Sequence, residues 1–193
     1  MAQAPDLKLV PTPGQTIGPF YGYALPYADG HKLVDRAHPG SIRLHGTVYD
    51  GKGAVVPDSM LEIWQADEHG NIAQKDGSLV RDGFTFTGWG RVAVDNVGHY
   101  TFQTVNPGAT DEGKAPFIML VVFARGLLNR LFTRIYLPED TAALENDPLL
   151  KSLSEEQRKT LIATREENGD LRFDIHLQGE NETVFLAYPR NGE

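Results

Sequence analysis

Hydrophobic and polar residues alternate along residues 41–65, and this stretch predicts the centre of the fold. Leu44 and Val48 fall on one face of an extended chain, with polar side chains between them on the other face. A period of two is typical of a half-buried β-strand. A glycine-rich turn follows at 50–53, and an apolar segment follows at 60–65. We therefore expect two strands joined in a hairpin-like arrangement.

Further strands are predicted by turn residues that recur as they do in an all-β domain. The apolar run at 117–123 is unbroken, which is typical of a strand covered on both faces. A turn at 96–98 predicts that one strand returns on the strand before it. The other expected strands cover residues 90–95, 99–105, 131–137 and 173–177, with a short last strand at 183–186.

Residues 138–169 interrupt this pattern with two helix start signals. An acid is followed by a proline at 147–148, where a missing N–H costs nothing in the first turn of a helix. Ser154 and Gln157 have the spacing of a capping box, and the helix after it is expected to reach Arg165. The predicted fold class is mainly β, an antiparallel β-sandwich with a short helical excursion.

Residues 1–40 differ from the rest of the chain. Prolines alternate with glycines in this segment, which argues against a helix and against a central strand. Aromatic residues such as Phe20 and Tyr21 are too frequent for a disordered tail. We expect an extended N-terminal arm that packs on a partner subunit, and a single sandwich domain over 41–193.

Composition narrows the function classes. The chain has 193 residues and a net charge of −8, which argues against a nucleic-acid partner. No apolar run approaches the roughly 20 residues that span a bilayer, so no membrane role is expected. The N-terminus lacks the features of a signal peptide, and the absence of cysteine fits a bacterial cytoplasmic location and excludes thiolate sites.

Common catalytic motifs are absent from the sequence. It contains neither a G-x-S-x-G element nor a P-loop. The six histidines are isolated along the chain, so none forms the close pair that a simple metal site would favour. Motif spacing alone therefore assigns no catalytic residue.

Several segments nevertheless resemble the intradiol ring-cleaving dioxygenases. The similar segments are residues 12–20, 44–50, 61–67, 104–108 and 172–185. They cover nearly the whole chain, in the order found in that family. The resemblance implies a β-sandwich core and a non-haem ferric iron held by two tyrosines and two histidines. It also implies insertion of both atoms of dioxygen between the hydroxyl-bearing carbons of a catechol.

The chain departs from that family at each iron ligand. The first tyrosine belongs where Ile72 stands, and the second belongs at 109–111. The two histidines belong at Phe117 and Met119. Ferric iron prefers anionic oxygen and imidazole ligands, which these side chains cannot supply. We therefore expect no iron in this chain.

The sequence resembles one branch of the family more closely, a non-catalytic α-type subunit that pairs with a homologous iron-bearing β subunit. In that branch this subunit completes the pocket for a small aromatic substrate at the interface. The resemblance carries four substrate-binding residues to this chain: Gly18, Pro19, Phe20 and Arg125. No catalytic residue is expected here, and ferric iron is expected in the partner.

Each of these residues also has a purely structural interpretation. Arg125 could end a buried strand with its charge in water, whereas a guanidinium also matches the carboxylate of a benzoate. Gly18 and Pro19 could form only a turn, and Phe20 could be a packing residue of the arm. Two other functions stay open: a complete homomeric ring-cleaving enzyme, and a non-catalytic β-sandwich binding or structural module.

Overall fold

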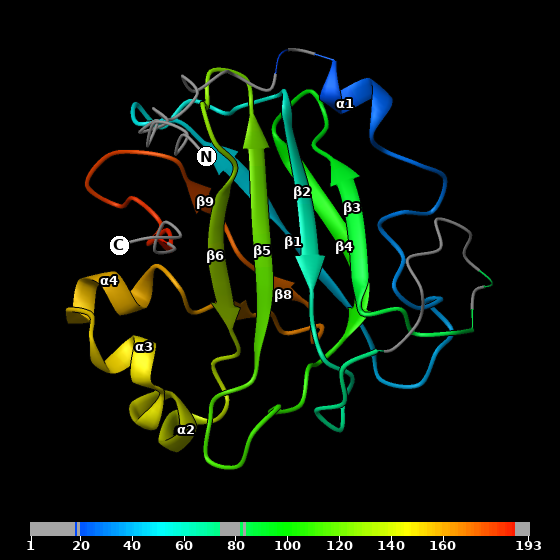
Figure 1. The fold of residues 1–193 in the computed structure, drawn as a ribbon, viewed down its shortest axis with the longest axis vertical. Coiled ribbons are helices and arrows are strands. Elements are labelled where there is room, and N and C mark those ends of the chain that lie inside the picture. The colour runs from blue at the N-terminus through cyan, green and yellow to red at the C-terminus, as the bar shows by residue number, and fades with distance from the viewer. Residues whose placement is uncertain (1–17, 19, 74–81, 83, 188–193) are drawn as a thin grey trace, which may run out of the picture.

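The computed structural model describes residues 18, 20–73, 82 and 84–187. Two β-sheets pack face to face, and three short helices lie together beside one edge (Figure 1). The predicted β-sandwich is confirmed. Within the described residues, no helix is long and apolar enough to cross a membrane.

The two sheets differ in strand order. The first has the order β4-β1-β8-β7, with β9 also paired to β1, and the second has the order β3-β2-β5-β6. The strands are β1 Ser41–Tyr49, β2 Ser59–Trp64, β3 Trp89–Ala93, β4 His99–Val105, β5 Phe117–Ala124, β6 Leu131–Tyr136, β7 Thr164–Arg165, β8 Leu171–Arg172 and β9 Ile175–His176.

The strands β1 and β2 belong to different sheets, so the expected hairpin is wrong. The turn does close locally, because the Asp50 amide donates to the Ala54 carbonyl at 2.8 Å. Beyond this turn the chain crosses to the second sheet, where β2 pairs with β3 and β5. The strands β3 and β4 are likewise divided between the sheets, although a turn joins them. Crossing lets consecutive strands bury their apolar faces against each other.

The core lies between the two sheets. Leu44 and Val48 of β1 are fully buried, as the alternation predicts. The apolar run of β5 alternates between the core and the outer face, where Met119 is only partly buried. Other core members are Leu61, Ile63, Tyr100, Phe102, Ile118, Leu120, Val122, Ile135 and Leu171.

The helical excursion contains α2 Thr141–Asn146, α3 Pro148–Lys151 and α4 Glu155–Lys159. Asp147 caps α3, and Ser154 with Gln157 forms the expected capping box of α4. However, α4 ends at Lys159 rather than continuing to residue 165, because 164–165 form β7. The sequence interpretation missed α2, which is capped by Asp140.

The arm contains a helix, which corrects the prediction that proline and glycine exclude one. A single turn, α1 Tyr21–Ala24, begins after Phe20. It fits because the flanking prolines, Pro19 and Pro26, lie outside the turn. Part of the arm packs on the chain's own sandwich: the Leu33 side chain is 1% exposed and joins the core.

The C-terminal part pairs differently from the prediction. Two short strands, β8 and β9, replace one strand over 173–177, and both run parallel to β1. Between them the chain passes so close to Gly46 that a Cβ there would lie 1.9 Å from the Phe173 carbonyl oxygen. Residues 183–186 form no strand, yet the Leu186 amide donates to the Phe132 carbonyl at 2.7 Å.

Candidate functional site

The structure describes three of the four expected substrate-binding residues. Gly18 adopts a φ of +82°, a backbone conformation that glycine reaches without strain. Phe20 precedes α1 and its side chain is 74% exposed, so it is not a packing residue of this chain alone. Arg125 directly follows β5. Pro19 lies outside the described residues.

Asp58 connects the arm to the end of β5. The Arg125 Nη2 atom lies 2.6 Å from the Asp58 Oδ2 atom. The Tyr21 hydroxyl donates to the backbone carbonyl of the same aspartate. Helix α1, next to Phe20, and the strand end that carries Arg125 are therefore held at one end of the molecule (Figure 1).

The Tyr21 phenol is kept neutral in this arrangement. Its pKa is raised to about 12, first because of burial and second because of the nearby charge of Asp58, while Arg125 opposes the shift. A neutral phenol can donate to the Asp58 carbonyl, and a phenolate could not. This hydrogen bond therefore persists throughout the physiological pH range.

Arg125 itself sits in a solvent-accessible position. Its side chain is 66% exposed, and its salt bridge with Asp58 holds the guanidinium at the strand end. An exposed ion pair contributes little to stability, about 0–1 kcal/mol. The position thus fits both interpretations from the sequence, and its contact with substrate stays a prediction.

The positions of the expected iron ligands hold side chains that do not fit ferric iron. Phe117 and Met119 lie on the outer face of β5, and Ile72 is 64% exposed in the loop after β2. The Arg134 guanidinium carbon lies 4.0 Å from the centre of the Phe117 ring, so a fixed cation occupies this neighbourhood. Over the described part of the chain, no group of three His, Cys, Asp or Glu residues could hold a metal ion.

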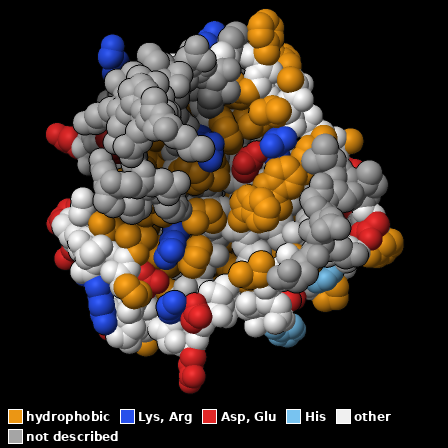
Figure 2. All heavy atoms as spheres, in the orientation of Figure 1, with side chains coloured by type: hydrophobic (Ala, Val, Ile, Leu, Met, Phe, Trp, Pro, Cys, Tyr) orange, Lys and Arg blue, Asp and Glu red, His pale blue; other side chains and the backbone are white. Residues whose placement is uncertain are grey.

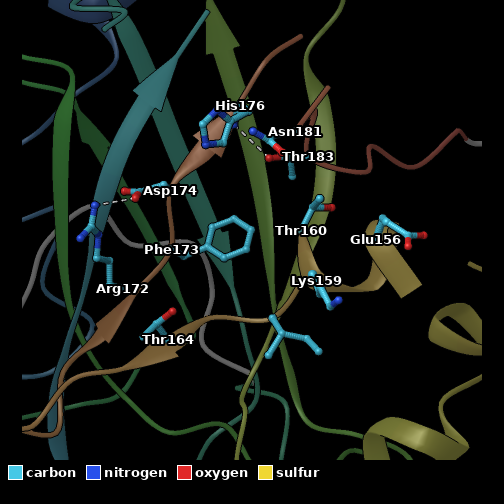
Figure 3. Close-up of a pocket in the computed structure, with 11 residues that line it drawn as sticks. Glu156, Lys159, Thr160, Thr164, Arg172, Phe173, Asp174, His176, Asn181 and Thr183 are labelled. Carbon is cyan, nitrogen blue, oxygen red and sulfur yellow. Dashed lines mark hydrogen bonds and ion pairs between the residues drawn. The ribbon is translucent and has the colours of Figure 1, made fainter. Parts of the chain in front are cut away.

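A large cavity of about 640 Å³ lies between α4 and the C-terminal strands (Figure 3). Phe173 points into it from the segment between β8 and β9, while Lys159 faces it from α4. Two of its charged groups are paired with each other: Arg172 Nη2 lies 2.7 Å from Asp174 Oδ2. The sequence interpretation missed this cavity, because its lining comes from segments without any shared motif.

Two histidines that are far apart in sequence meet on the outer face of the first sheet. His45 Nδ1 and His99 Nε2 are 3.3 Å apart, and His45 Nε2 lies 3.1 Å from Glu166 Oε2. The prediction that all six histidines are isolated is therefore wrong for His45 and His99, which are neighbours in the folded chain. The pairing of β1 with β4 brings them together, and only that register could have revealed it.

Comparison with known proteins places the chain in a family. The family described as Dioxygenase matches residues 17–179. The chain belongs to this dioxygenase family, a class of oxidoreductases, and the predicted resemblance to the intradiol enzymes is confirmed.

Two curated relatives match over almost their full length. The protocatechuate 3,4-dioxygenase alpha chain of Burkholderia cepacia is 36% identical, over 91% of this chain and 96% of the relative. The alpha chain of Pseudomonas putida is 38% identical, over 94% and 99%. The protocatechuate 3,4-dioxygenase beta chain of Burkholderia cepacia is 34% identical, over 72% of this chain and 64% of the relative.

Solved structures agree on the fold. The dioxygenase domain of a carbohydrate-binding fusion protein from Streptomyces sp. SirexAA-E has a TM-score of 0.55 and is 25% identical. It covers 88% of this chain and 99% of that domain.

Proposed function

We propose that this chain is the α subunit of a protocatechuate 3,4-dioxygenase. It associates with a homologous β subunit that holds the ferric iron, and the complex cleaves 3,4-dihydroxybenzoate to 3-carboxy-cis,cis-muconate in the bacterial cytoplasm. The observation that carries the proposal is full-length similarity to two alpha chains of that enzyme. The apolar side chains at the ligand positions support placing the iron in the partner.

The contribution of this chain is to bind and orient the substrate. Gly18, Pro19 and Phe20 supply backbone and an aromatic wall, and Arg125 supplies a positive charge for the substrate carboxylate. The pair with Asp58 supports this role, because it holds the guanidinium in one place before substrate arrives. Orientation of a bound reactant lowers the entropic part of a barrier.

The outer face of the second sheet is the surface that suits the partner. Trp64, Met119 and Arg134 form one cross-strand row, and Val121 and Phe132 form part of the next. Trp64 is 54% exposed, and hydrophobic side chains gather over this sheet in Figure 2. Large exposed apolar patches mark interaction sites, and obligate interfaces resemble a divided core.

Co-expression tests the proposal. The chain should co-purify with the iron-bearing β subunit from its own source, and the complex should cleave protocatechuate. A Trp64→Glu substitution should abolish co-purification, because it places a charge in the apolar face. Val97→Glu is the matched control, since Val97 is 61% exposed in the turn between β3 and β4. If the chain co-purifies with no iron-bearing paralogue, it would instead be a binding or structural module.

A further inference from the structure

A second cavity, of about 380 Å³, opens where the loop after β4 meets β5, β6 and α3. This volume lies within the ordinary range of small-molecule pockets, about 300–1,000 Å³. Both apolar and cationic side chains face it. Its lining includes Thr110, Lys114, Phe117, Arg134, Pro148 and Leu149.

Arg134 is the unusual member of this lining. Its guanidinium carbon lies 4.0 Å from the centre of the Phe117 ring, and its Nη1 atom donates to the Tyr136 hydroxyl at 3.2 Å. The Nε atom is buried and has no hydrogen-bond acceptor among the described residues. No carboxylate of those residues forms a salt bridge with it. A buried N–H without an acceptor is costly and calls for an explanation.

The two acids at the cavity are already engaged. Asp147 accepts from the Tyr136 hydroxyl at 3.0 Å and from the Leu149 and Leu150 amides at 2.9 and 3.2 Å. Asp111 pairs with Lys114 at 2.8 Å. Arg134 is therefore linked to a carboxylate only through the Tyr136 hydroxyl, so among the described residues the positive charge of its guanidinium has no direct ion-pair partner.

We propose that this cavity binds a small monocarboxylate with a compact apolar body. A carboxylate forms charge-assisted hydrogen bonds with a guanidinium, which would supply the ion-pair partner that Arg134 lacks among the described residues. Pro148 and Leu149 provide the apolar wall for the body of the ligand. A doubly charged phosphate fits less well, because Asp147 and Asp111 stand close by.

The site lies at the start of β5, whereas Arg125 lies just beyond the end of the same strand. The inference rests only on the contacts around Arg134. It does not depend on the proposed function or on iron. Binding here can therefore succeed or fail independently of co-purification.

Equilibrium dialysis with benzoate tests the proposal on the full-length chain, in the form in which it purifies. Arg134→Met keeps an apolar stem over Phe117 and removes the charge. We expect it to weaken benzoate binding by about 10-fold or more at one site per chain. Arg130→Met is the matched control, because the Arg130 guanidinium lies 5.0 Å from the Phe132 ring but outside the cavity. This control should bind benzoate as the unsubstituted chain does.

A second variant distinguishes loss of the binding site from misfolding of the chain. Thr110 is exposed on the loop at the cavity, so Thr110→Trp should block the cavity without disturbing the core, and should remove the same site. Benzyl alcohol, which lacks the carboxylate, should not compete with benzoate, and acetate should compete only weakly. The proposal is overturned if folded Arg134→Met and Thr110→Trp chains bind benzoate unchanged, or if the unsubstituted chain binds none.

Discussion

The guanidinium of Arg125 is held 2.6 Å from the carboxylate of Asp58, at the end of the strand that also carries Phe117 and Met119. One strand thus connects an exposed cation with the two positions at which the family resemblance places the ligand histidines. Under the proposed function, this chain binds the substrate and its partner holds the iron.

Arg125→Met should lower kcat/KM for protocatechuate in the intact complex. A charge-assisted hydrogen bond is worth about 1.5–3 kcal/mol where water is scarce, which corresponds to about 10- to 150-fold. Because Arg125 is largely exposed in the isolated chain, we expect a factor within or below this range. Steady-state kinetics with protocatechuate and with an uncharged catechol measure it, and the uncharged substrate should lose less.

The pattern of losses separates the alternatives for Arg125. Equal losses for both substrates would mean that the arginine supports the interface. No loss for either would mean that it is a solvated strand end. Asp58→Asn is the companion variant, because it leaves Arg125 in place and removes its salt-bridge partner.

The isolated chain should contain no stoichiometric iron. Ile72, Phe117 and Met119 offer no hard ligand, and the cation of Arg134 beside Phe117 repels a metal ion. Metal analysis and the visible spectrum of the purified chain measure this. A red-brown chain with one ferric ion per molecule would refute the assignment of iron to the partner.

Without its partner, the chain should self-associate. Phe20 and Tyr23 are 74% and 87% exposed around α1, which is costly in water. Sedimentation velocity should show aggregation that co-expression with the β subunit relieves. The double variant Phe20→Ser and Tyr23→Ser should reduce it, and Val97→Ser should not. A well-behaved monomer would contradict this expectation.

Alkaline pH should destabilise the chain through Tyr21 and Tyr136. The pKa of each is raised from its ordinary value of 10.0 to about 12, mainly by burial. A raised pKa means that the folded state binds the proton more tightly. This stabilisation is complete below pH 10 and is lost as pH rises through about 12.

Urea denaturation between pH 9 and pH 12 measures this loss. Tyr21→Phe should be less stable at pH 9, because it loses the hydrogen bond to Asp58, but its free energy of unfolding should fall less steeply above pH 10. Tyr23→Phe is the control, since its ring is exposed, and it should follow the original profile. An unchanged slope in Tyr21→Phe would contradict the assignment.

Asp147→Ala should be among the costlier substitutions outside the core. The side chain is almost fully buried and caps α3 while accepting from Tyr136. We expect a loss of about 2–4 kcal/mol in the free energy of unfolding, because the cap and a hydrogen bond to a charged group disappear together. Asp140→Ala, which removes only the exposed cap of α2, should cost about 1 kcal/mol by the same denaturant measurement.

The sequence predicts the elements better than their pairing. Alternation along 41–49 and the apolar run of β5 predict strands because burial on one or both faces is a local pattern. Sheet membership is not local, so the hairpin expected after residue 49 proved to be a crossing between sheets. The helix α1 was missed because a single turn leaves almost no periodic signal.

For the candidate site, too, the sequence predicts individual residues better than the contacts between them. Gly18, Phe20 and Arg125 could be named from family resemblance. The link from Tyr21 to Arg125 through Asp58 could not, since Asp58 belongs to no motif. The cavity at Arg134 and the meeting of His45 with His99 depend on register between strands. No spacing along a single segment carries that information.

The parallel pairing of β1 with β8 and β9 determines when the chain can finish folding. Leu44 pairs with Leu171, so one edge of β1 stays unpaired until residue 171 has been synthesised. Synthesis at about 5–20 residues per second makes that wait roughly 6–25 s. During this time the unpaired strand edge can pair with strands of other chains. This edge of β1 is therefore closed only when β8 and β9 are in place.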